Sequence, residues 1–190
     1  LKPANTSLLP FSLNQTFLIV WASLFVGYIP CMLAFFPGLC CYDIGWQLEQ
    51  FRTWTFSTHH PLIHTLFAGG LLEFGKRVLG SYYGGAFLHS LIQLFLFSGS
   101  MAFAVRFLVK RKTNSGIVIL TWAYFLLFPF FPVLGISTTK DILFSSFFLI
   151  TFVCICDMAN NQSFYQGIKL VFFLACTVLM CLFRNNAIYG

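Results

Sequence analysis

Hydrophobic residues along this chain occur in long runs that are separated by short polar intervals. Such runs are typical of helices that cross a membrane. A helix of about 20 residues, rising 1.5 Å per residue, covers the roughly 30 Å hydrocarbon core of a bilayer. The pattern predicts an all-α fold, a polytopic transmembrane helix bundle of about five spans. The predicted spans are residues 16–36, 82–105, 117–134, 142–156 and 168–183.

The longest polar interval, residues 37–80, contains no uninterrupted apolar run of 18 residues. Aromatic and aliphatic residues mix with charged ones over residues 42–56, which indicates a helix lying in the membrane interface. Pro61 suits the first position of a second helix, capped by Thr58 or His59 and ending near Phe74. The interval therefore predicts a large loop that carries interfacial helices.

Composition supports a membrane protein. The chain is 58% hydrophobic and 8% charged, with 26 phenylalanines in 190 residues, whereas soluble domains average roughly 25% charged residues. Its net charge of +6 is scattered, apart from a cluster at Arg106, Lys110, Arg111 and Lys112 that adjoins a predicted span. A juxtamembrane basic cluster indicates the cytoplasmic side rather than nucleic-acid binding. We therefore expect a multi-pass protein of the cell membrane, surrounded by lipids, with the large loop on the extracytoplasmic side.

The cysteines and the chain ends add less. Seven cysteines follow no metal-binding spacing, and the adjacent pair Cys40 and Cys41 is poorly placed for a disulfide. The sequence begins with Leu1 and stops just after a predicted span. We expect residues 1–190 to form a single transmembrane domain, the amino-terminal fragment of a longer protein.

Candidate chemistry gathers on the predicted outer side, at Asp43, at Lys140 and Asp141, and at Arg184 and Asn185. Taken singly, Lys140 and Arg184 are typical membrane anchors and Asp141 is a typical helix cap. Charges near span ends are otherwise rare unless they pair or function. Together with Asp43, which could act as a general base or a metal ligand, they favour a site.

Two pairs of polar residues have helical spacing. His60 and His64 are four residues apart, so on a helix they would share one face. With Asp43 or Glu49 they could hold a divalent metal, although a His-Pro pair also serves simply as a rigid helix start, and we assign no metal ligand. His89 and Gln93 lie inside a predicted span, where hydrogen bonding between helices is the expected role.

Four short features surround this candidate site. The first two lie in the large loop and the other two lie at the ends of later spans. They are Tyr42-Asp43 just after the first span, His60-Pro61 with His64 and Thr65 at a helix start, Asp141 at the head of a span, and Arg184 at the end of another.

Together these features resemble the amino-terminal half of the GT-C glycosyltransferases, which use polyprenyl-phosphate sugars. Within that group the layout is most similar to protein O-mannosyltransferases and to a set of bacterial polytopic membrane proteins. Those enzymes pair Asp with Glu and carry His-Pro-Pro, whereas here Ile44 follows Asp43 and Leu62 follows Pro61.

The resemblance implies a transferase that moves a sugar from a lipid-linked phosphate donor to an extracytoplasmic hydroxyl. It implies catalytic roles for Asp43 and Asp141. Lys140 and Arg184 are assigned to donor phosphate by their charge alone. The expected substrate-binding residues are Tyr42, His60, His64, Lys140, Arg184 and Asn185.

Two alternatives remain open at this stage. The same charges could line the path of a transporter or flippase half, or the chain could be a non-catalytic membrane subunit of a cell-envelope assembly complex. A transporter should carry broken helices and polar residues near span midpoints, and only Pro30, His89 and Gln93 have that character. The polar residues concentrate in a surface loop, which favours surface chemistry. The sugar, the acceptor and the oligomeric state stay open.

Overall fold

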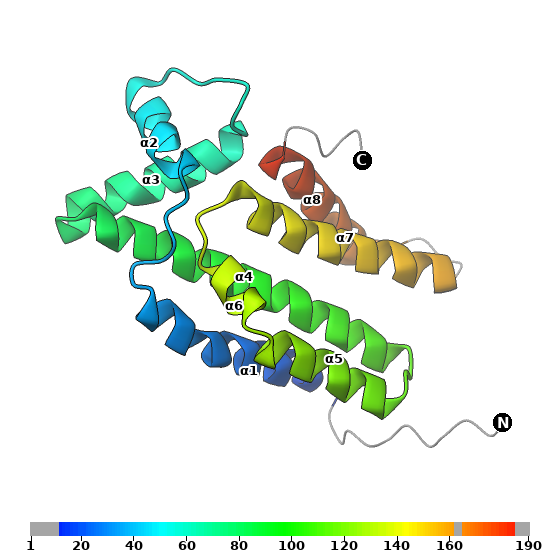
Figure 1. Ribbon diagram of the computed structural model, residues 1–190. Helices are drawn as coiled ribbons and strands as arrows, with labels where there is room; N and C mark the ends of the chain where they lie inside the picture. Colours follow the sequence, from blue (N-terminus) through cyan, green and yellow to red (C-terminus); the bar gives the residue numbers. More distant parts are fainter. Residues whose placement is uncertain (1–11, 162–164, 185–190) are drawn as a thin grey trace, which may run out of the picture.

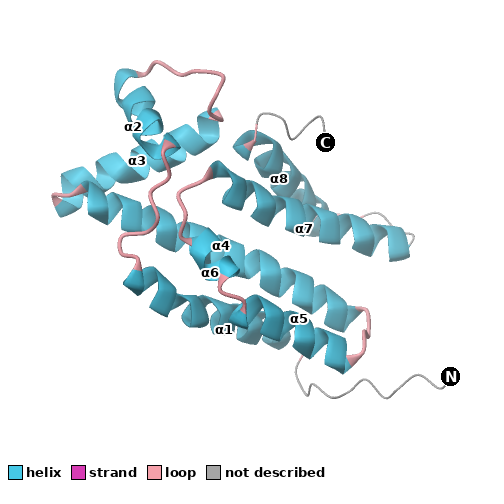
Figure 2. Ribbon diagram, viewed as in Figure 1, coloured by secondary structure: helices cyan, strands magenta, loops and turns pink. Residues whose placement is uncertain are grey.

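The structure is a computed structural model that describes residues 12–161 and 165–184. Within these residues every named element is a helix, which confirms the predicted all-α class there (Figures 1 and 2). The helices are α1 (Leu13–Ala34), α2 (Asp43–Thr53), α3 (Leu62–Leu79), α4 (Tyr82–Lys110), α5 (Ser115–Leu127), α6 (Phe130–Gly135), α7 (Lys140–Asn161) and α8 (Ile168–Phe183).

Three of these helices, α1, α4 and α7, are long and apolar enough to cross a membrane. They hold 22, 29 and 22 residues, or about 33, 43 and 33 Å at the helical rise. Helices α5 and α8 are also apolar but shorter, with 13 and 16 residues. Helix length in the described chain therefore supports three spans and does not establish the predicted count of five.

The predicted span 117–134 is not one helix, because the chain breaks between α5 and α6. Phe128 is extended (φ −77°, ψ 114°), as expected of a residue that precedes proline. Pro129 has no N–H to donate to the carbonyl of Phe125 four residues earlier. The hydroxyl of Tyr28 on α1 donates to that carbonyl instead, at 2.6 Å. The break is thus hydrogen-bonded within the bundle.

The apolar helices run back and forth between two ends of the bundle (Figure 1). The first, here the Asp43 end, holds α2, α3, residues 136–141 and the last residue of α8. The second, here the Asp157 end, holds the start of α1, the ends of α4 and α7, and the start of α8. Ion pairs between helices mark both ends: Arg184 with Asp141 at the first, and Lys110 with Asp157 at the second.

The main core lies between α1 and α4, with α5 and α6 against it, and includes Leu24, Leu94, Ala102 and Val105. A smaller core of Ile44, Ala68, Leu72 and Ala86 lies where α4 extends past α1 and packs on α3. Small residues allow helix backbones to approach closely, and the resulting van der Waals contacts help to hold helices together in lipid. At the α3–α4 crossing, a Cβ on Gly75 would lie 2.1 Å from the backbone nitrogen of Gly85.

The polar interval does form two helices, α2 and α3, with some differences from prediction. Helix α3 continues five residues beyond Phe74 and ends at Gly80, whose φ of +71° suits glycine. At its start, the cap position is occupied by Pro61, and no side chain accepts a hydrogen bond from the first backbone N–H groups of the helix. The predicted cap by Thr58 or His59 is therefore wrong, and His60 precedes the helix.

A polar contact joins the three helices around the smaller core. Arg52 of α2 donates to Glu73 of α3 at 2.5 Å and also to the hydroxyl of Tyr82 of α4, which itself donates to Glu73 at 3.2 Å. The hydrogen bond from Arg52 holds the pKa of Glu73 below its usual value. These contacts attach the last turn of α2 to the α3–α4 hairpin.

Candidate functional site

A backbone contact between two distant segments brings the predicted site residues together. Leu39 N–H donates to the carbonyl of Ile136 at 3.0 Å, and Thr138 N–H donates back to the carbonyl of Leu39 at 2.9 Å. Cys41 N–H then donates to the Thr138 hydroxyl oxygen at 2.9 Å. Because residues 39–41 and 136–138 lie side by side, α2 and α7 begin next to each other.

Two side chains of helix α4 bind the backbone of residues 135–137. The Gln93 amide donates to the carbonyls of Gly135 and Ser137, at 2.9 and 2.6 Å. The Ser90 hydroxyl donates to the carbonyl of Ile136 at 3.2 Å. The predicted interhelical hydrogen bonding is thus confirmed for Gln93, which reaches Gly135 of α6, but is wrong for His89, whose two ring nitrogens have no partner among the described residues. The position of the turn before α7 depends on the buried side chains of Ser90 and Gln93.

The resulting site contains four of the predicted charged residues in two pairs. Asp43 Oδ2 lies 3.8 Å from Lys140 Nζ and 3.9 Å from His60 Nδ1. Asp141 Oδ1 lies 3.8 Å from Arg184 Nη1. All three distances exceed the roughly 2.7–3.2 Å of a charge-assisted hydrogen bond. The charges are close enough to attract one another, yet each retains hydrogen-bonding capacity.

Helix ends explain three of these charges but not the fourth. Asp43 and Asp141 lie in the first turns of α2 and α7, where the helix dipole favours a carboxylate. Arg184 follows the last residue of α8, where the dipole favours a cation, and its guanidinium lies 5.0 Å above the Phe144 ring. Lys140 is the first residue of α7, where a cation is disfavoured, and its side chain is only 22% exposed. Lys140 therefore depends on Asp43 for compensation.

His60 lies next to Asp43, and its side chain is almost completely buried. Its Nδ1 has no hydrogen-bond partner among the described residues. Burial lowers the pKa of His60 more than the neighbouring Asp43 carboxylate raises it, so the imidazole is neutral at pH 7. A neutral imidazole offers one donor and one acceptor.

His64 continues this buried polar region. Its Nδ1 lies 3.0 Å from Gln47 Oε1, and its ring centroid lies 5.7 Å from that of His89. Burial, followed by the neighbouring His89 and Lys140, lowers the pKa of His64 to about 3. His64 therefore stays neutral over the whole physiological range.

Several buried polar atoms in this region have no hydrogen-bond partner within the described chain. Native proteins leave few such atoms unpaired, so a cluster of them marks a place where bound water or a polar ligand would supply the missing partners. The sequence named Thr65 at the helix start without giving it a role. Gln47 was not predicted, although it follows Asp43 by four residues and so shares its face of α2. The atoms are Gln47 Nε2, His60 Nδ1, His64 Nε2, Thr65 Oγ1, both ring nitrogens of His89, and Gln93 Oε1.

Other predicted residues are not brought into contact with this site. The Tyr42 side chain is 82% exposed, and Asn185 lies outside the described residues. Within residues 12–161 and 165–184, no group of three His, Cys, Asp or Glu side chains is arranged to hold a metal ion. His60 and His64 do not share a helix face, because His60 precedes α3.

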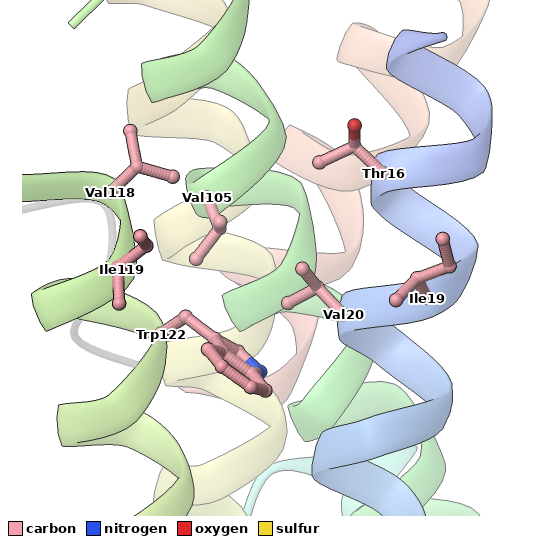
Figure 3. A pocket seen from close by; sticks show the side chains of 7 residues that line it. All are labelled: Thr16, Ile19, Val20, Val105, Val118, Ile119 and Trp122. Atoms are coloured by element: carbon pink, nitrogen blue, oxygen red, sulfur yellow. The ribbon is translucent and has the colours of Figure 1, made fainter. Parts of the chain in front are cut away.

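A hollow between α1, α4 and α5 differs in character from the site at the Asp43 end (Figure 3). It encloses about 310 Å³, and its lining is aliphatic and aromatic, including Ile19, Val105 and Trp122. The polar side chain in its lining, Thr16, donates to the carbonyl of Ser12 at 3.1 Å. This hollow offers no reactive group, so the candidate site remains at the Asp43 end.

Comparison with known families gives one match. A family model described as a family of unknown function, DUF6020, matches residues 50–189. The chain belongs to the DUF6020 family. The matched part includes His60, His64, Lys140, Asp141 and Arg184, and begins seven residues after Asp43. Comparisons of this DUF6020 chain with curated proteins and with solved structures found no match.

Proposed function

We propose that this DUF6020 protein is a membrane-embedded glycosyltransferase that moves a sugar from a polyprenyl-phosphate donor to the hydroxyl of an acceptor at the Asp43 end. The observation that carries the proposal is the spaced pair of Asp43 and Lys140, 3.8 Å apart. A carboxylate and a cation lie within reach of the same substrate without being hydrogen-bonded to each other. The second pair, Asp141 and Arg184, directly adjoins the first through the Lys140–Asp141 peptide bond.

In the proposed reaction Asp43 is the general base. The acceptor oxygen forms a bond to the anomeric carbon of the sugar while the bond from that carbon to the phosphate oxygen breaks, with inversion at this carbon. Asp43 takes the proton of the acceptor hydroxyl, and the bonding electrons leave with the phosphate. The 41% exposure of the Asp43 side chain leaves it open to an acceptor. General-base catalysis contributes typically 10²–10⁴-fold to such a step.

Lys140 and Arg184 are proposed to bind the donor phosphate, and Asp141 to orient Arg184. The phosphate gains negative charge as it leaves, so a fixed cation stabilises the transition state more than the ground state. Arg184 adds a planar fork that matches phosphate oxygens. Lys140 can exchange its 3.8 Å contact with Asp43 for a shorter bond to phosphate.

The buried polar region is proposed to bind sugar or acceptor hydroxyls. His60 and His64 are neutral at pH 7, and each has a ring nitrogen without a partner among the described residues. A hydroxyl can both donate and accept a hydrogen bond, so it suits a neutral imidazole beside the Gln47 amide. Tyr42, exposed at the edge of α2, and Asn185 are proposed to contact the same substrates.

The proposal also requires that all five apolar segments cross the bilayer. Their alternating direction in the bundle supports this (Figure 1), with α5 and α6 acting together over residues 115–135. Arg106, Lys110, Arg111 and Lys112 lie at the Asp157 end, which by the positive-inside rule is proposed to be cytoplasmic. The Asp43 end would then face the extracytoplasmic side, where lipid-linked sugars are used.

A transporter is the competing function, because His89 and Gln93 are buried polar side chains within α4. A transport path needs such groups to continue toward the other end. Further along α4 the buried polar residues are Ser98 and Ser100, and both hydroxyls donate to carbonyls of their own helix. Along α4, the buried polar atoms without a hydrogen-bond partner thus lie on His89 and Gln93, near the Asp43 end, which favours surface chemistry over passage.

The decisive experiment compares Asp43→Asn with Glu49→Gln. Glu49 lies on the same helix, is exposed, and makes no side-chain hydrogen bond within the described chain. Purified protein is incubated with radiolabelled polyprenyl-phosphate sugars and a set of hydroxyl acceptors, and sugar transfer is measured. We expect Asp43→Asn to lower transfer by roughly 100-fold or more, while Glu49→Gln retains it. Transfer by Asp43→Asn at the parent rate would exclude the proposed base.

The proposed sidedness is tested with a membrane-impermeant maleimide. All seven cysteines are free thiols, and Cys40 is exposed at the Asp43 end. Burial raises the pKa of the Cys40 and Cys41 thiols, so labelling should be run near pH 8.5 to obtain enough thiolate. Intact cells should be labelled, and the double variant Cys40→Ser/Cys41→Ser should not. Labelling that appears only after permeabilisation would reverse the orientation.

A further inference from the structure

A hollow of about 480 Å³ opens at the Asp157 end, between the starts of α1 and α8 and the ends of α4 and α7. Three cations line it: Arg106 and Lys110 from α4, and Lys169 from α8. Asp157 is the carboxylate in the lining, and Tyr165 lies beside it. The hollow is therefore positively charged, and it lies far along the bundle from the candidate transferase site.

The carboxylate in this hollow is already engaged. Lys110 Nζ lies 2.7 and 2.5 Å from the two carboxylate oxygens of Asp157, and the Tyr165 hydroxyl donates to Oδ2 at 2.8 Å. Arg106 makes only a long contact of 3.4 Å with the Asn14 side chain. Within the described residues, the Lys169 ammonium group makes no hydrogen bond or ion pair. Arg106 and Lys169 thus retain capacity for an anionic ligand.

The lining changes from charged to apolar with depth. Helix α4 ends at this side and α8 begins there, so a residue earlier in α4 or later in α8 lies deeper in the bundle. Phe103 precedes Arg106 by three residues and Phe172 follows Lys169 by three, about 4.5 Å along each helix. Their ring centroids lie 5.9 Å apart. Two cations at the rim therefore stand above two aromatic rings.

We propose that this hollow binds an anionic phospholipid of the surrounding bilayer, with its headgroup phosphate between Arg106 and Lys169 and its first acyl methylenes against Phe103 and Phe172. The ligand that fits must be anionic at the rim and apolar below, at the end of helices long enough to cross a membrane. A phospholipid has both parts at this spacing, and basic hollows between membrane helices suit such headgroups. The proposal does not depend on the transferase activity.

Native mass spectrometry of the protein in mild detergent tests the proposal. Dioleoylphosphatidylglycerol is added in one series and the zwitterionic dioleoylphosphatidylcholine in another, and bound lipids per protein are counted. We expect one phosphatidylglycerol to bind with clear preference. The double variant Arg106→Gln/Lys169→Gln should bind it roughly tenfold more weakly or worse, and each single variant should be intermediate.

The matched control is Arg111→Gln/Lys112→Gln, which removes the same charge at the same end but outside the lining. This control should keep the affinity of the parent. Equal losses in both double variants would mean bulk charge attraction and would overturn the site. Equal binding of the two lipids would also overturn it, as would complete displacement by inorganic phosphate, which would indicate an anion site without a lipid role.

Discussion

The two ends of the bundle hold their charges in different ways. At the Asp157 end, the buried carboxylate of Asp157 lies 2.5 Å from Lys110 and accepts a further hydrogen bond from Tyr165. At the Asp43 end, the partly exposed carboxylate of Asp43 lies 3.8 Å from Lys140 and 3.9 Å from His60. Both ends join α7 to another part of the chain through ion pairs, yet only the Asp157 pair is hydrogen-bonded.

This difference separates a structural pair from a candidate reactive one. A carboxylate whose oxygens already accept hydrogen bonds from a lysine and a tyrosine stabilises the fold and has little capacity left to bind a substrate. A carboxylate spaced from its cation gains less stability but keeps its acceptor sites. The comparison predicts that changes at the Asp157 end affect mainly folding, while side-chain changes at the Asp43 end affect mainly activity.

The largest effect should follow from disrupting the backbone that supports the Asp43 end. Gly38 has a φ of +126°, and a Cβ there would lie 2.1 Å from the Ser90 hydroxyl. Gly38→Ala should lower the free energy of unfolding by about 3 kcal/mol, since strain and steric overlap add. Gly45→Ala is the control, because nothing lies within 4 Å of its Cβ site and it is in a helix. Thermal unfolding in detergent measures both, and an unchanged midpoint for Gly38→Ala would contradict the arrangement.

The next effect compares the two carboxylates directly. Asp157→Asn should lower the free energy of unfolding by about 2 kcal/mol, because it leaves the Lys110 ammonium without its charged partner. Asp43→Asn should change it by less than about 1 kcal/mol, since its contacts are long and partly exposed. Denaturant or thermal unfolding of both variants provides the measurement. A larger loss for Asp43→Asn would reverse the proposed division of roles.

Acid should destabilise the Asp43 end through its buried histidines. The pKa of His64 is about 3 in the folded protein and roughly 6.5 in an unfolded chain. Because the unfolded chain binds the proton first, this stability is complete above about pH 6.5 and falls as the pH drops toward 3. The slope should approach about 1.4 kcal/mol per pH unit. The free energy of unfolding, measured from pH 7.5 to 5, should fall with this slope in the parent and less steeply in His64→Gln. The control is His59→Gln, at an exposed position, which should show the same slope as the parent.

The smallest change distinguishes an anchor from a phosphate ligand at Arg184. Arg184→Lys keeps a cation at the end of α8 and above Phe144 but loses the planar fork. We expect normal insertion and stability with roughly tenfold lower sugar transfer, about 1.4 kcal/mol. Lys140→Ala should weaken binding of a polyprenyl phosphate, whereas Arg77→Ala, an exposed cation at the same end, should not. Full activity of Arg184→Lys would return Arg184 to an anchoring role.

The sequence by itself determined the helical class, the three long apolar helices and the two helices in the polar interval. These features depend on local properties: the length of an apolar run and a proline at a helix start. Local rules erred where a helix length depends on packing. The smaller core carries α3 five residues beyond Phe74, and the bond from Tyr28 to the carbonyl of Phe125 stabilises the break that precedes α6.

Only the tertiary structure decided which charges meet. Asp43 reaches Lys140 because Thr138 donates two hydrogen bonds to the carbonyl of Leu39, 99 positions earlier in the chain, while Gln93 of α4 binds the carbonyl of Ser137. No local pattern encodes a contact between segments so far apart in the chain. The same holds for Gln47, which is buried and polar only because α2 folds onto α3 beside His64. Sequence named the reactive residue types, and long-range packing decided their partners, their burial and their protonation.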